Sequence, residues 1–218
     1  ATGAAYLYVF GGRQPEREGM VYDGSEKVAS LNDLHRLDLT SGSWEQLHCS
    51  GDIPSPRSYH QMLHLDGSLF VFGGMSENDR FNDLYMCDIR SGRSSHEWRR
   101  LPDGPMEGRG GAGVCAVGGR NPRLWVVGGF CGRPVGDVWE FSITANTWRA
   151  REDLALPEPR SIFACGVVGE PDCNELEIRV FGGELTEAGG NSEAGKYTDD
   201  TLRIRPVGGR VDVATVAG

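Results

Sequence analysis

An apolar segment that ends in a pair of glycines recurs four times along the chain. The segments are LYVFGG at 7–12, LFVFGG at 69–74, LWVVGG at 124–129 and IRVFGG at 178–183. The second glycines lie 62, 55 and 54 residues apart, and a recurring unit of that length indicates a repeat architecture. Each apolar run suits a strand buried on both faces, and the glycines let the chain turn at positive φ.

The second unit predicts four strands, at 57–66, 68–74, 84–89 and 97–101. An aspartate precedes the third strand of every unit, and a tryptophan begins the fourth strand of the first three: Asp33, Asp83, Asp137 and Asp200, then Trp44, Trp98 and Trp148. In the first and third units the tryptophan follows the aspartate by 11 residues, and in the last unit that spacing places Val211 at the tryptophan position. We interpret the tryptophans as packing anchors between neighbouring sheets. The unit is therefore an antiparallel four-stranded meander.

Such meanders, repeated radially, form a β-propeller. The period, the glycine pairs and the later tryptophan resemble the kelch repeat. We predict an all-β fold, a single kelch-type β-propeller domain over residues 1–218, with about four blades at 6–48, 56–101, 109–152 and 160–216. The first unit begins at its second strand, and 210–216 is expected to be the outer strand of the fourth blade. The prediction is a partial or small propeller that is not sealed into a six-bladed ring.

Charge and composition narrow the possible partners. The chain of 218 residues has a formal net charge of −9, which argues against nucleic acid or an anionic membrane as its main partner. No apolar run approaches the roughly 18 residues of a membrane span. Its six cysteines contain no C-x-x-C pair, so we expect reduced thiols and a cytoplasmic location.

Three arginines occupy equivalent starts of inner strands: Arg57, Arg109 and Arg160. In an up-and-down meander these starts share one end with the loops that follow the glycine pairs, and we call this end the loop face. A rim of guanidinium groups suits an anion. Alternatively, each arginine braces a loop carboxylate such as Glu184 or Asp137. The candidate ligand-binding residues are the three arginines with Phe130 and Glu184.

A series of motifs occurs in fixed order, PRSYH, GRGGAG, LWVVGGF, PRSIF and FGGE…GKYTDD, and the similarity it carries extends over roughly residues 30 to 205. The series resembles the kelch proteins of the plant specifier family, which redirect glucosinolate breakdown. That resemblance implies a ferrous iron site directly after the last glycine pair. Glu184 matches the first ligand of that site, Glu187 could replace the aspartate, and Asn191 or Ser192 stands in place of the histidine. Two carboxylates and an amide suit a hard cation better than ferrous iron.

Two functions follow. The first is a binding module without a cofactor or catalytic residues, which recognises a protein segment or a small anionic ligand on the loop face. The second is a ferrous iron-dependent lyase or isomerase acting on glucosinolate-type aglycones. His60 and His64 support neither function, because four residues of a strand span about 13 Å and the two side chains cannot reach one ion.

Overall fold

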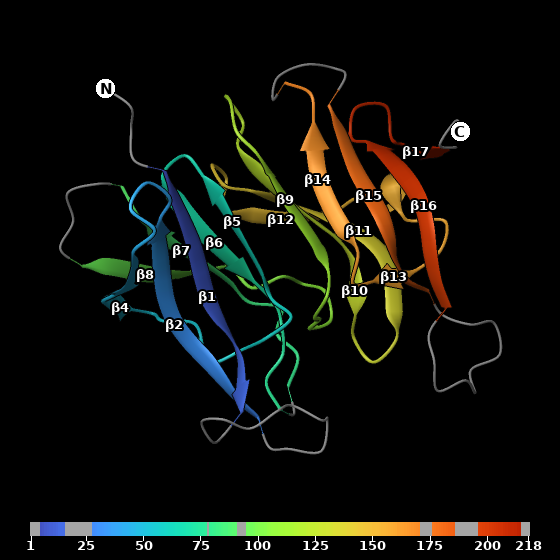
Figure 1. The fold of residues 1–218 in the computed structure, drawn as a ribbon. Coiled ribbons are helices and arrows are strands. Elements are labelled where there is room, and N and C mark those ends of the chain that lie inside the picture. Colours follow the sequence, from blue (N-terminus) through green and yellow to red (C-terminus); the bar gives the residue numbers. More distant parts are fainter. Residues whose placement is uncertain are drawn as a thin grey trace.

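The computed structural model describes residues 5–15, 28–77, 79–90, 95–170, 176–185 and 196–214. The fold is all-β: four small sheets are arranged radially as the blades of a four-bladed β-propeller (Figure 1). Within the described ranges, the only helical element is a 3-10 turn, η1 (Glu152–Leu154). None of these residues belongs to a helix long and apolar enough to cross a membrane.

Each blade is one sheet. Blade 1 holds β1 (Tyr6–Pro15), β2 (Val28–Asp38) and β3 (Trp44–Leu47). Blade 2 holds β5 (Gln61–Leu65), β6 (Ser68–Phe72), β7 (Leu84–Asp88), β8 (His96–Leu101) and the added β4 (Cys49–Gly51). Blade 3 holds β9 (Gly113–Val117), β10 (Arg123–Phe130), β11 (Pro134–Ser142) and β12 (Thr147–Ala150). Blade 4 holds β13 (Arg160–Ser161), β14 (Ala164–Val168), β15 (Glu177–Leu185), β16 (Lys196–Arg205) and β17 (Arg210–Ala214).

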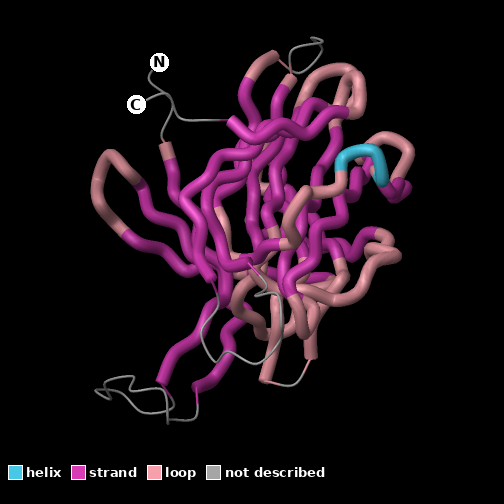
Figure 2. The backbone as a smooth tube through the Cα atoms, turned by 90° about the vertical axis from the view of Figure 1, so that its right-hand side faces the viewer, coloured by secondary structure: helices cyan, strands magenta, loops and turns pink. Residues whose placement is uncertain are grey.

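The strand order follows the predicted meander. Blade 1 begins at the second strand of the repeat, and β17 pairs with β16 as the outer strand of blade 4. One strand was not predicted: β4 pairs in parallel with the outer edge of β8. In Figure 2 the strands run between the two ends of the blades, and loops connect them at both ends.

The core lies between the blades rather than within them. Three buried clusters join blade 1 to blade 2, blade 2 to blade 3, and blade 3 to blade 4. Trp98 is 1% exposed in the first cluster, and Trp148 packs against the second. Trp44 is 56% exposed, so the expectation that it packs between sheets is wrong. The expected burial of the second strands also fails for β1, whose Leu7 and Val9 are exposed, and for one face of β15, where Phe181 is exposed.

The glycine pairs allow neighbouring blades to approach closely. Gly73 and Gly74 have φ of 62° and 93°, values that a residue with a Cβ rarely adopts. A Cβ on Gly73 would lie 2.8 Å from the backbone oxygen of Arg109 in the next blade. Gly128 has the same relation to Arg160, also at 2.8 Å. The repeated glycines are therefore required both by the turn and by the interface.

The five cysteines in the described ranges carry free thiols, while Cys173 lies outside them. Burial raises the pKa of the Cys87 thiol to about 12. This thiol is protonated at neutral pH and packs as a small apolar side chain.

Candidate functional site

Each of the three predicted arginines is buried and binds the aspartate of its own blade with both terminal nitrogens. The Nη–Oδ distances are 2.6 and 2.9 Å for Arg57–Asp83, 2.5 and 3.0 Å for Arg109–Asp137, and 2.6 and 3.2 Å for Arg160–Asp200. The arginines are at most 2% exposed. We call each pair a clamp, because it ties the start of the inner strand to the start of the third strand.

Each guanidinium also donates to backbone carbonyls. Nη1 donates to the carbonyl of the first glycine of the pair, at 2.9 Å for Gly73, 3.1 Å for Gly128 and 3.2 Å for Gly182. Nε donates to the carbonyl two residues earlier in the chain, in all three blades. The clamp thus fixes the strained glycine turn as well as the two strands.

The predicted rim of guanidinium groups around the channel mouth is therefore wrong. A buried guanidinium that donates to a carboxylate and to backbone carbonyls is not presented to a ligand at the surface. The structure agrees with the alternative, in which each arginine braces a carboxylate. Asp137 is one of the carboxylates braced, whereas Glu184 is not.

Hydrogen bonds set the ionisation of two clamp carboxylates. Burial of Asp137 opposes its charged form, but hydrogen bonds from Arg109 and the Trp139 indole outweigh burial and lower its pKa. The hydrogen bond from Arg160, helped by Thr198, lowers the pKa of Asp200. Both carboxylates are charged at neutral pH and complete their clamps.

Beside the clamps, the backbone joins the blades near the propeller axis. The amide of Gly111 donates to the carbonyl of Tyr59 at 2.9 Å, and the amide of Ile162 donates to the carbonyl of Gly111 at 2.8 Å. All three residues stand two positions after a clamp arginine and have φ between 54° and 58°. Positive φ is a genuine outlier for a β-branched residue such as Ile162, and such strain clusters at functional sites.

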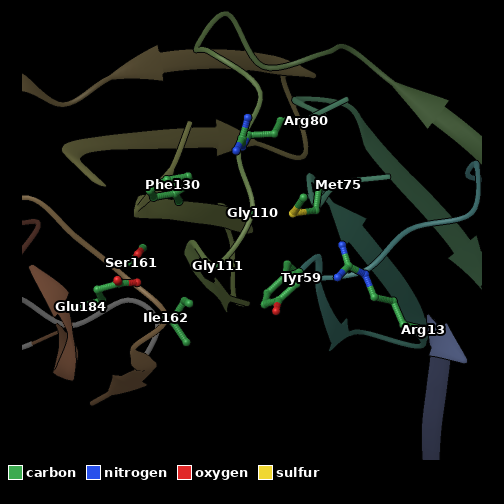
Figure 3. A pocket seen from close by; sticks show the side chains of 10 residues that line it. All are labelled: Arg13, Tyr59, Met75, Arg80, Gly110, Gly111, Phe130, Ser161, Ile162 and Glu184. Atoms are coloured by element: carbon green, nitrogen blue, oxygen red, sulfur yellow. The ribbon is translucent and has the colours of Figure 1, made fainter. Parts of the chain in front are cut away.

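A cavity of about 330 Å³ opens at this point of the loop face (Figure 3). One group of its lining residues follows directly after the four glycine pairs, one residue from each blade: Arg13, Met75, Phe130 and Glu184. A second group follows the clamp arginines: Tyr59, Gly110, Gly111, Ser161 and Ile162. Arg80 completes the lining. The repeat therefore brings equivalent positions of all four blades to one site.

The cavity combines aromatic surface with charge. The Arg13 guanidinium lies 5.4 Å from the centre of the Tyr59 ring, and the Arg80 guanidinium lies 5.1 Å from the centre of the Phe130 ring. Both arginines are exposed. Glu184 and Ser161 lie at the opposite side (Figure 3), where the buried Ser161 hydroxyl has no hydrogen-bond partner among the described residues. The arrangement can hold an apolar side chain between polar groups of both signs.

The sequence-predicted residues divide into two sets. Phe130 and Glu184 line the cavity, whereas the three clamp arginines lie behind it. The sequence reasoning missed Arg13, Met75 and Tyr59, although Arg13 and Met75 follow glycine pairs just as Phe130 and Glu184 do. Of the three expected metal ligands, Glu187 and Asn191 lie outside the described residues. Within the described ranges, no group of three His, Cys, Asp or Glu side chains could hold a metal ion.

Comparison with known proteins decides the family. The model of the KLHDC2/KLHL20/DRC7 Kelch-repeats domain matches residues 1–183. The chain belongs to the kelch-repeat family. This kelch chain is 30% identical to Kelch domain-containing protein 3 of Bos taurus over 75% of its length, covering 44% of that protein. It is 23% identical to human Host cell factor 2 over 76% of its length, covering 23% of that protein.

A third relative is named for an acyl-CoA-binding domain. Acyl-CoA-binding domain-containing protein 5 of Arabidopsis thaliana is 35% identical over 56% of this kelch chain, which covers 17% of that protein. The chain thus spans less than half the length of these three relatives.

Proposed function

We propose that this kelch domain is a protein-interaction module that binds a protein segment in the loop-face cavity. The observation that carries the proposal is that one side chain from each blade lines the same cavity, and that its identity differs between blades: Arg13, Met75, Phe130 and Glu184. The strands and clamps behind these positions repeat, while the four side chains differ. A rigid scaffold that presents differing side chains at equivalent positions suits recognition.

The chemistry of the cavity favours a segment that pairs an apolar side chain with an acidic one. Tyr59, Phe130 and Ile162 offer apolar contact surface, and aromatic anchors contribute much of the energy of protein interfaces. Arg13 and Arg80 are exposed and lie beside the Tyr59 and Phe130 rings, where their guanidinium groups suit a carboxylate of the bound segment. This local positive charge acts despite the net charge of −9, because nearby geometry decides a contact.

Panning a library of random phage-displayed peptides against the immobilised chain tests the proposal. We expect the selected peptides to combine acidic and apolar residues. Phe130→Ala and Arg80→Ala should each weaken their binding about tenfold or more, the range of interface hot spots. Arg99→Ala, at an exposed arginine of β8 outside the cavity, serves as the matched control. A library that yields no enriched sequence, or peptides that bind both cavity variants normally, would overturn the proposal.

A ferrous iron-dependent lyase remains the second prediction from the sequence, and it rests on Glu184 alone among described residues. Elemental analysis of the purified chain separates the two functions. Stoichiometric iron that is lost in Glu184→Gln would favour the lyase, whereas peptide binding that is unchanged by a chelator would favour the interaction module.

A further inference from the structure

The cavity on the loop face carries opposite charges on its two sides. Arg13 comes from blade 1 and Arg80 from the loop after β6 in blade 2, whereas Glu184 comes from blade 4. Figure 3 shows the Glu184 carboxylate across the cavity from both guanidinium groups and on the same side as Ser161. We call Glu184 and Ser161 the acidic pole of the cavity.

The sheet register places the two side chains of the acidic pole side by side. Ser161 of β13 is the antiparallel partner of Glu184 in β15. Side chains directly opposite each other in such a pair share one face, with Cβ atoms about 5 Å apart. Ser161 is fully buried and its hydroxyl has no hydrogen-bond partner among the described residues, whereas Glu184 is partly exposed. The pole therefore offers a carboxylate and, next to it, an unpaired hydroxyl.

The equivalent residue pairs of blades 2 and 3 carry no charge. Isolated β-bridges join Ser58 to Met75 and Gly110 to Phe130, and these residues stand at the same positions after the clamp arginine and the glycine pair. The Ser58 hydroxyl also lacks a partner among the described residues, but the residue opposite it is a methionine. Among these three pairs, only the pair of blade 4 combines a hydroxyl with a carboxylate.

The chemistry of the acidic pole suits a cationic side chain. A buried hydroxyl without a partner costs free energy, which a ligand that pairs with it recovers. An ammonium or guanidinium group has several hydrogen-bond donors and no acceptor, so it can donate to the Glu184 carboxylate and to the Ser161 hydroxyl together. A carboxylate of the ligand would be repelled by Glu184, and it is attracted to Arg13 and Arg80 on the other side.

The size of the cavity limits the distance between the two charges of a bound segment. A sphere of the same volume, about 330 Å³, is roughly 9 Å across, which is the length of about three residues of extended chain at 3.3 Å per residue. The apolar surface of Tyr59, Phe130 and Ile162 lies between the charged groups (Figure 3). One short segment can therefore contact both charged sides while an apolar side chain occupies the middle.

We propose that Glu184 and Ser161 bind a lysine or arginine side chain, so that the recognised segment carries a basic and an acidic residue within about three positions of each other, together with an apolar one. This inference rests on the proposed interaction module and adds the second charge that its partner presents. The acidic residue of the segment contacts Arg13 and Arg80. The two charges therefore determine which way round the segment lies in the cavity.

Titration calorimetry with peptides selected from the random phage-displayed library tests this charge pattern. On the native chain, replacing the basic residue of a selected peptide by glutamine should weaken binding about tenfold. Glu184→Gln should cause the same loss with the original peptide, and Ser161→Ala, which keeps the carboxylate, a loss of about threefold. Glu97→Gln, at an exposed glutamate of β8 outside the cavity, is the matched control and should bind normally. Far-UV circular dichroism checks that the variants remain folded.

Charge reversal is the decisive arm. Glu184→Lys should bind the original peptide poorly and regain binding when the basic residue of the peptide is replaced by glutamate. Selected peptides that lack a basic residue, or normal binding in Glu184→Gln or Ser161→Ala, would overturn the inference; if Phe130→Ala still weakened their binding, the interaction module itself would stand. A library that yields no enriched peptide would contradict the module and, with it, the charge pattern.

Discussion

At the residue scale, the clamps between arginine and aspartate determine what the loop face can do. Each holds a glycine turn, an inner strand and a third strand together, and each removes its guanidinium from the surface. Buried ion pairs of this kind are costly to break, because the partner that remains is a buried, uncompensated charge.

Asp83→Ala should therefore lower the free energy of unfolding by about 3 to 5 kcal/mol. Arg57 is fully buried and would lose both of its carboxylate bonds. Asp103→Ala is the control, because its pair with Arg100 is about half exposed and such pairs contribute about 1 kcal/mol or less. Urea unfolding measures both values. Equal, small losses for the two variants would contradict the structural role of the clamp.

The clamps also reverse one expectation from the sequence. At the exposed rim that the sequence predicted, replacement of Arg109 would affect ligand binding more than folding, whereas in a clamp it affects folding. The spacing of the three arginines located the end of the blade correctly but not the direction of the side chains. Of their partners, Asp137 had been considered as a carboxylate that an arginine braces, whereas Asp83 and Asp200 had been identified only as strand markers. Pairing across 26 to 40 residues depends on the register of the sheet, which local patterns do not specify.

His60 gives the fold a dependence on pH. Burial, aided by the charge of Arg57, lowers its pKa to about 4, and its ring packs edge-on against Phe10 with centres 5.4 Å apart. The unfolded chain therefore binds a proton more readily between about pH 6.5 and pH 4, so stability falls as the pH is lowered through this range.

We expect the free energy of unfolding to decrease by up to about 3 kcal/mol from this histidine between pH 7 and pH 4. His60→Gln removes the titrating group and should flatten that part of the curve, which urea unfolding at each pH measures. The lowered pKa values of Asp137 and Asp200 make the stability of the fold depend on pH in a more acidic range, and this dependence is retained in the variant. An unchanged slope between pH 6.5 and pH 4 would contradict this role of His60.

At the element scale, the apolar strand with its glycine pair is the unit that could be predicted from the sequence. The pattern located β6, β10 and β15 and their neighbours. In β6 and β10 the apolar run is buried on both faces, whereas β15 keeps Arg179 and Phe181 exposed. The pattern did not reveal β4, which pairs in parallel through its backbone. It also did not show that β1 keeps one face exposed, because burial depends on whether a neighbouring blade covers the strand.

Gly73→Ala should destabilise the chain more than Gly42→Ala does. Both glycines have positive φ, and a Cβ on Gly42 would meet nothing within 4 Å, whereas one on Gly73 would meet the Arg109 oxygen at 2.8 Å. Gly42→Ala therefore reports the conformational cost of about 1 to 2 kcal/mol, and the excess in Gly73→Ala reports the approach of blade 3. Thermal unfolding of both variants measures the difference. Equal losses would show that the interface relaxes without cost.

At the scale of the whole molecule, four blades bring four equivalent positions to one cavity. The sequence predicted the loop face and two of its lining residues, Phe130 and Glu184. Arg13 and Met75 follow glycine pairs and could have been found by the same pattern. The contributions of Tyr59 and Arg80 depend on how the blades are placed about the axis, which no local pattern records. This geometry is the basis of the proposed interaction module.

Photo-crosslinking of a selected peptide tests this account most directly. A photoreactive phenylalanine analogue replaces Tyr59 in one variant and Val207 in a second; these side chains are 50% and 51% exposed, in the cavity and in the turn at the opposite end of blade 4. The account predicts that the peptide crosslinks to position 59, that Phe130→Ala abolishes the crosslink, and that position 207 stays unlabelled. Equal labelling of both positions, or labelling of position 207 alone, would contradict it.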